Sequence, residues 1–249
     1  MISKELLSAR QYEEREGAMI PEEDRPVYHF SPRVGWLNDP NGLSYYKDKY
    51  HLFYQYHPYN TYWGPMYWGH AVSDDMISWQ YLPAALAPDT EYDRTGCFSG
   101  SASTLPDGRQ FLMYTGVLDD GTDPLGKGRW KQQQCIAVLS DETGEYENYE
   151  GNPVLTEADL PEGGDVFEFR DPYLWKADDG TYRAVAANGR TGEITAEGTY
   201  RTDKAGRKSC TEYQSSCRRK QLFIHIDISV GYRPYPRTTK TEGRAEPSD

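Results

Sequence analysis

Short strand-like segments, paired around a turn, recur along most of this chain. Aromatic and β-branched residues lie on both sides of Asp, Gly or Pro, as is typical of two antiparallel strands joined by a tight connection. No helical pattern of ten residues separates them, which argues against a parallel sheet with crossover helices. The sequence therefore predicts an all-β, antiparallel protein. The paired segments lie at residues 42–58, 66–83, 97–116, 134–149 and 171–187.

The similarity among these hairpins favours one architecture. An aromatic strand, an acidic turn and a second strand recur in several of them, as in the blades of a β-propeller. Their spacing is only loosely regular, so a β-sandwich remains the alternative on the pattern alone. Residues 3–18 carry a helical pattern that ends before Pro21, which predicts one short N-terminal helix.

Composition narrows the class of function. A net charge of −12 over 249 residues leaves no basic surface for phosphate contacts, so no nucleic-acid partner is expected. The sequence has no apolar run long enough for a membrane span and no signal-like N-terminal stretch, so we expect a cytoplasmic protein without a membrane partner. The Cys and His residues lack metal-ligand spacing, and neither a metal nor another cofactor is expected.

The character of the sequence changes near residue 190. Every Trp lies at or before residue 175, and basic residues outnumber acidic ones after residue 190. Only the stretch 221–232 there looks like a strand, and the Pro-, Thr- and Arg-rich end is typical of disorder. We therefore divide the chain into an N-terminal helical segment (1–26), a partial propeller (27–189) and an atypical tail (190–249), for which disorder or a frame shift would account.

Two Asp residues stand out because each precedes a Pro at a predicted strand. Asp39 lies in the stretch WLNDPNG, and Asp171 lies in FRDPYLW directly after Arg170. Turn chemistry alone could explain the first stretch, although a plain turn rarely follows Trp and Leu. Between the two, the stretch FSGS places Phe98 and Ser99 among small residues. Each stretch alone is a weak signal, whereas the three in this order are specific.

These stretches resemble glycoside hydrolase family 32, the invertases, levanases and inulinases. That family carries Trp-x-Asn-Asp-Pro-Asn-Gly, then Phe-Ser-Gly-Ser, then Arg-Asp-Pro, which correspond here to 36–42, 98–101 and 170–172. The resemblance covers roughly residues 27–185 and ends near residue 190. It implies a five-bladed β-propeller, of which this chain would hold about the first three blades.

The resemblance also implies roles for single residues. Asp39 would be the nucleophile of a retaining mechanism, because an oxocarbenium-like state needs a carboxylate opposite the leaving group. Asp171 would bind two fructose hydroxyls more tightly at the transition state, and Arg170 would keep it ionised. For Trp63 and Phe98, packing in the core is the alternative interpretation. The positions that match the family's fructose pocket are Asn38, Gln55, Trp63, Phe98 and Ser99.

One essential group has no counterpart in the sequence. Retaining hydrolysis needs a second carboxyl group as acid and base, which in the family is a Glu before a Cys. This chain contains no Glu-Cys pair, and the neighbours of Glu212 do not match, so the acid/base remains unassigned.

The expected activity is hydrolysis of β-fructofuranosides such as sucrose, sucrose 6-phosphate or fructans, so the expected partner is a small sugar. Without the later blades we expect this chain to be a poor catalyst. A module that binds fructosides without hydrolysing them is the alternative function, and an arabinanase-type propeller is a more distant one.

Overall fold

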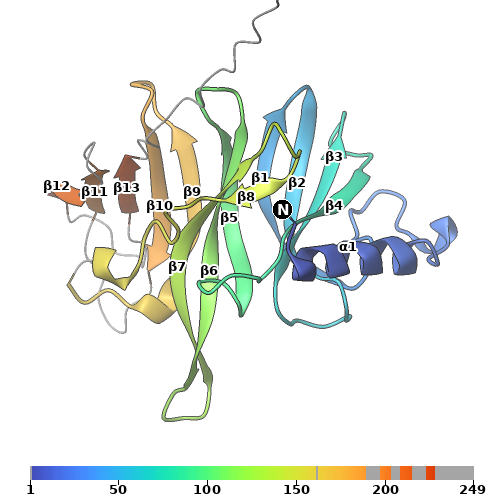
Figure 1. The fold of residues 1–249 in the computed structure, drawn as a ribbon, viewed down its shortest axis with the longest axis horizontal. Helices are drawn as coiled ribbons and strands as arrows, with labels where there is room; N and C mark the ends of the chain where they lie inside the picture. Colours follow the sequence, from blue (N-terminus) through green and yellow to red (C-terminus); the bar gives the residue numbers. More distant parts are fainter. Residues whose placement is uncertain (1, 161, 189–196, 203–207, 215–222, 228–249) are drawn as a thin grey trace, which may run out of the picture.

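The computed structural model describes residues 2–160 and 162–188, together with the backbone of three strands between residues 197 and 227. One α-helix, α1 (Lys4–Gly17), precedes a series of antiparallel strands (Figure 1). The side chain of Ser3 accepts a hydrogen bond from the backbone N–H of Leu6, which caps the first turn of α1. The predicted N-terminal helix is confirmed to within one residue at each end.

Two four-stranded antiparallel sheets and one hairpin form the body of the protein. Each sheet is a meander in which consecutive strands are neighbours, as tight turns between strands require. The first sheet contains β1 (Trp36–Tyr46), β2 (Lys49–His57), β3 (Tyr67–Ser73) and β4 (Gln80–Leu86). The second contains β5 (Gly96–Thr104), β6 (Gln110–Thr122), β7 (Gly128–Leu139) and β8 (Tyr146–Asn148), and the hairpin contains β9 (Phe169–Lys176) and β10 (Tyr182–Asn188).

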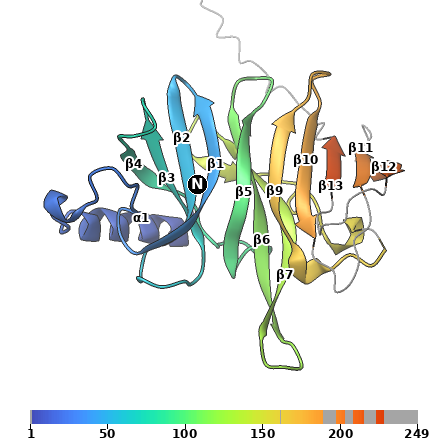
Figure 2. The same cartoon turned by 180° about the vertical axis from the view of Figure 1, so that it is seen from behind.

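The first strands of the sheets lie side by side. Strand β5 contacts β1 on one side and β9 on the other, and both views of the ribbon show the three in this order (Figures 1 and 2). This is the arrangement of successive propeller blades around their innermost strands, rather than of two stacked sheets. The all-β prediction is confirmed, and the β-sandwich alternative is wrong. Three short 3-10 turns, η1 (Glu22–Asp24), η2 (Glu157–Asp159) and η3 (Val166–Glu168), lie in the connections.

Part of the predicted tail forms strands. A third sheet has the order β12-β11-β13, with β11 antiparallel to β12 and parallel to β13. Strand β13 falls inside the stretch predicted as a strand, whereas β11 and β12 were not expected because their sequences show no clean alternation of apolar and polar residues. Residues 228–249 lie outside the described residues. The bounds are β11 (Glu197–Thr202), β12 (Lys208–Gln214) and β13 (Phe223–Asp227).

Apolar side chains fill the spaces between the sheets. One cluster, centred on Phe53, Trp68 and Tyr114, joins the first sheet to the second. A second, centred on Phe111 and Phe169, joins the second sheet to β9 and β10. Each fully buried side chain of this size contributes about 1.5–3 kcal/mol to stability. These clusters fix the relative positions of β1, β5 and β9.

Helix α1 bridges the first two sheets. The Arg10 side chain donates to the carbonyl of Ala84 at 2.9 Å and forms two bonds to the Glu145 carboxylate, at 2.9 and 2.6 Å. Buried Glu13 accepts a bond from the Ala84 N–H at 2.9 Å.

Within the described part of the chain, no helix has the length and hydrophobicity needed to span a membrane.

Candidate active site

The three sequence stretches singled out above share one backbone feature, a β-bulge near the start of an innermost strand. In β1 the pairing with β2 shifts register between Leu37 and Pro40, around Asp39. In β5 the shift surrounds Ser99, and β9 pairs irregularly with β10 around Asp171. A bulge adds one residue on its strand and changes the direction of the local side chains. The stretch WLNDPNG is therefore a bulged strand and not a plain turn.

The bulges bring Asp39 and Ser99 together across neighbouring sheets. The Ser99 hydroxyl donates to the Asp39 carboxylate (Oδ2) at 3.1 Å, at an exposed position. Beside them, the indole N–H of Trp36 donates to the Asn38 amide oxygen at 3.3 Å. The predicted nucleophile thus lies at the surface of β1 with its orientation held by a residue of β5.

Asp171 lies on the far side of β5 from Asp39. Its backbone has φ 57°, in the left-handed region that is costly for a residue with a side chain. The Arg170 Nε lies 3.5 Å from the Asp171 carboxylate, and the same guanidinium forms a 2.9 Å ion pair with Glu168. Glu168 was not predicted as a neighbour of this site.

Burial raises the pKa of Asp171 above its ordinary value, although its side chain is 49% exposed. The positive charge of Arg170 opposes this increase in pKa, and the negative charges of Asp39 and Glu168 add to it. Arg170 therefore acts in the predicted direction, but desolvation has the larger effect. Asp39 and Asp171 thus lie near the starts of β1 and β9, the two innermost strands that flank β5.

Two buried polar residues that were not predicted connect β6, β7 and β9. The Thr115 hydroxyl accepts from the Asp171 N–H at 3.1 Å and donates to the Gln134 amide oxygen at 3.0 Å. The Gln134 amide donates in turn to the Phe169 carbonyl at 2.8 Å. Both Thr115 and Gln134 are fully buried. The only signal in the sequence is that each is a polar residue within an apolar strand, which names no partner.

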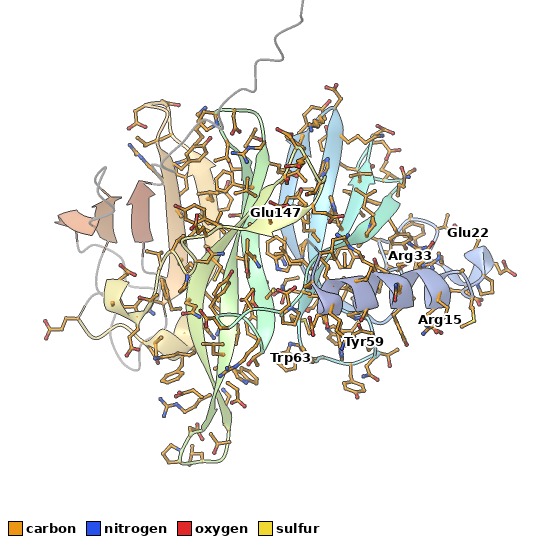
Figure 3. All side chains as sticks on the ribbon, in the orientation of Figure 1. Arg15, Glu22, Arg33, Tyr59, Trp63 and Glu147 are labelled. Atoms are coloured by element: carbon orange, nitrogen blue, oxygen red, sulfur yellow. The ribbon has the colours of Figure 1, made fainter. Side chains whose placement is uncertain are left out.

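Aromatic side chains border the site on the side of the second sheet. Trp63, in the connection between β2 and β3, is 44% exposed, so full burial in the core is excluded for it (Figure 3). Its ring lies 6.2 Å from that of half-buried Phe98 and 5.3 Å from that of Trp130, with the second pair inclined by 31°. Trp130 was not predicted as a site residue.

Gln55 lies deeper than the other predicted residues. It is buried, and its amide donates to the carbonyl of Cys97 at 2.8 Å, directly before Phe98. This bond fixes the start of β5, and direct contact of Gln55 with a sugar stays a prediction. Glu212 lies on β12. Among the described residues, no group of three His, Cys, Asp or Glu could hold a metal ion.

Comparison with known proteins decides the family. The sequence model described as "Glycosyl hydrolases family 32 N-terminal domain" matches residues 29–216, about three quarters of the chain. The chain belongs to glycosyl hydrolase family 32. The match runs past residue 190, where the sequence stretches that carry the resemblance end. The predicted family is thereby confirmed.

Curated relatives of this family 32 chain include a sucrose-6-phosphate hydrolase from Escherichia coli, 46% identical over 172 residues, which are 68% of this chain and 34% of the relative. An acid β-fructofuranosidase from Capsicum annuum is 47% identical over 59% of this chain and 22% of the relative. The chain thus spans about a third of the length of the first relative and less than a quarter of that of the second.

Solved structures agree with the sequence comparison. A Bombyx mori GH32 β-fructofuranosidase in complex with sucrose has 40% identity and a TM-score of 0.65, over 77% of this chain and 38% of that one. The structural neighbours are five-bladed propeller enzymes, which confirms the predicted fold class. Strands β1 to β10 thus form the first part of such a propeller.

Proposed function

We propose that this chain carries the nucleophile side of a retaining β-fructofuranosidase that acts on sucrose, sucrose 6-phosphate or a fructan. The observation that carries the proposal is the pair Asp39 and Asp171, which lie at bulges near the starts of β1 and β9, the innermost strands on either side of β5. Membership of family 32 supports it, as does the sucrose bound by the Bombyx mori relative.

The geometry suits the two carboxylates to different tasks. Asp39 is exposed and accepts a bond from the Ser99 hydroxyl, so its carboxylate is oriented for attack on the anomeric carbon of a fructosyl unit. The glycosidic bond then breaks as a covalent fructosyl-enzyme forms, and water later hydrolyses that ester. Asp171, held rigidly by Thr115 and faced by Arg170, binds the ring hydroxyls and does not react.

We expect this chain to hydrolyse sucrose slowly, because none of the described carboxyl groups is assigned as the general acid. The leaving oxygen of sucrose needs a proton, and the loss of a general acid costs about 10²–10⁴ in rate. Glu168 is engaged in its ion pair with Arg170, and we assign it no proton transfer. Fructoside binding without turnover is the second candidate function, which the same pairing of Glu168 favours.

A substrate that needs no acid separates these candidates. In β-fructosyl fluoride the departing fluoride requires no protonation, so the Asp39 carboxylate alone can break the carbon–fluorine bond. We expect the purified chain to release fluoride faster than buffer does, and Asp39→Asn to abolish that release. The matched control is Asp48→Asn, an exposed Asp between β1 and β2, which should release fluoride like the wild type.

Release that persists in Asp39→Asn would contradict the nucleophile assignment. Saturable fructose binding without fluoride release would instead select the binding module.

A further inference from the structure

The hairpin between β6 and β7 projects beyond the rest of the fold. Figure 1 shows it extending past the ends of the other strands, and Figure 3 labels Trp63 at that same end of the molecule. Strand β6 runs antiparallel to β5, so this hairpin lies beyond the start of β5, where Phe98 and Ser99 are found. Trp130 lies at its base, paired in register with Asp119.

Trp130 completes a cluster of three aromatic rings at the rim of the site. Its ring lies 5.3 Å from that of Trp63, tilted by 31°, and meets the Phe98 ring nearly edge-on, at 6.3 Å and 77°. None of the three rings is fully buried. Trp63, from the β2–β3 connection, and Trp130, from β7, both contact Phe98 near the start of β5. Such offset and edge-to-face pairs hold each other in place and add about 0.5–1.5 kcal/mol per pair beyond area burial.

The connection that carries Trp63 is also held firmly. The His57 ring donates to the Tyr62 carbonyl at 3.0 Å, and a Cβ added at Gly64 would lie 2.3 Å from that ring. The two residues that flank Trp63 are therefore packed on one buried imidazole. With Trp130 on the other side, the Trp63 indole has a fixed position and a solvent-facing surface.

The positions of Asp39 and Asp171 determine which ring of a fructoside, the fructosyl ring or the leaving-group sugar, can reach the aromatic cluster of Trp63, Phe98 and Trp130. A fructosyl ring bound by both Asp39 and Asp171 must lie across the start of β5, because those residues lie on β1 and β9. A unit joined to it through the glycosidic oxygen has to leave in the direction of solvent, past the strand ends. The aromatic cluster and the projecting hairpin border that exit on the side of the second sheet.

We propose that Trp130, held in place by Trp63 and Phe98, is a specificity-determining residue that binds the leaving-group sugar of the fructoside. Apolar faces of sugar rings suit a rigid aromatic wall, whereas the hydroxyls of the reacting ring require the carboxylates. The inference rests on the proposed function, since it takes the fructosyl position from Asp39 and Asp171. Trp130 should therefore contribute to the binding of a disaccharide and not to that of free fructose.

Calorimetric titrations of the whole chain with fructose and with sucrose test this, with chromatography to verify that the sucrose stays intact. For Trp130→Ala we expect the dissociation constant for sucrose to rise about three- to tenfold and that for fructose to change less than twofold. Trp130→Phe should restore most of the sucrose affinity. Leu125→Ala, at the exposed tip of the same hairpin, should behave like the wild type with both sugars.

The possible failures are distinguishable. Equal weakening of both sugars, or no weakening of either, in a Trp130→Ala protein with a wild-type circular dichroism spectrum would overturn the role of Trp130 alone. If that variant does not fold, Trp130→Phe decides, because a full loss of selectivity there excludes an aromatic wall. A wild-type chain that binds neither sugar would overturn the proposed function and this inference with it.

Discussion

The hydroxyl of Thr115 is the part of the candidate site whose removal has the most definite consequence. Thr115→Val keeps the shape of the side chain and removes only the group that joins Asp171 to Gln134. The Gln134 amide oxygen loses its donor while fully buried, which costs about 1–3 kcal/mol. The Asp171 N–H, in a strained left-handed residue, loses its acceptor, for about 1 kcal/mol more. The expected total is about 2–4 kcal/mol.

Urea unfolding of the two proteins measures this loss as a lower midpoint at an unchanged slope. Thr95→Val is the matched control, because its hydroxyl also accepts one backbone N–H, from Asp119, but at an exposed site. We expect Thr95→Val to cost less than about 0.5 kcal/mol. A Thr115→Val protein as stable as that control would mean that Asp171 is positioned without Thr115.

Three further predictions concern the helix, the pH dependence and the bulge of β5. Arg10→Met should destabilise the fold by about 1.5–3 kcal/mol in urea unfolding, because the ion pair of Arg10 with Glu145 is partly buried. The control Arg15→Met, at an exposed ion pair, should not destabilise it. Equal costs for the two variants would contradict the bridging role of α1. The pKa of Asp171 is raised in the folded protein, so fructose binding should weaken as the pH falls through that raised value. The same protonation favours the folded state, because the folded protein then binds the proton more tightly than the unfolded one. Binding titrations in which affinity is lost only at the pKa of an ordinary Asp would contradict this prediction. Gly100→Ala places a Cβ 2.0 Å from a backbone carbonyl oxygen of β6 and should lower the stability of the fold by about 1–3 kcal/mol. Gly128→Ala, where no atom lies within 3.4 Å of the added Cβ, should lower it little. Equal melting temperatures for the two variants would argue against a tight bulge in β5.

Sequence reasoning was most successful where the signal was local. Alternating apolar residues and turn residues predicted the hairpins, and the cap at Ser3 accompanies a helix whose pattern was visible. The Asp-Pro stretches, each ahead of a predicted strand, drew attention to Asp39 and Asp171, and the resemblance to family 32 supplied their predicted roles. They did not show that each Asp lies on a bulge, because a bulge is defined by pairing with another strand.

Features that depend on contacts between sheets could not be read from the sequence. Thr115 and Gln134 are ordinary polar residues until β6, β7 and β9 meet around them. Trp130 joins Trp63 and Phe98 only because a connection of the first sheet reaches the second. The net rise in the pKa of Asp171 also depends on how much water the neighbouring strands displace. Each of these is a property of the assembled blades.

The most direct test of the site is a titration with fructose and with glucose, which differ in ring geometry but not in composition. If Asp39 and Asp171 form a fructose site, the chain binds fructose in preference to glucose. Asp171→Asn then weakens fructose binding about tenfold or more, since hydrogen bonds to a charged group are lost. Exposed Asp178→Asn, in the β9–β10 turn, leaves fructose binding unchanged. Equal affinity for the two sugars, or an Asp171→Asn protein that binds fructose like the wild type, would mean that Asp39 and Asp171 do not form a fructose site.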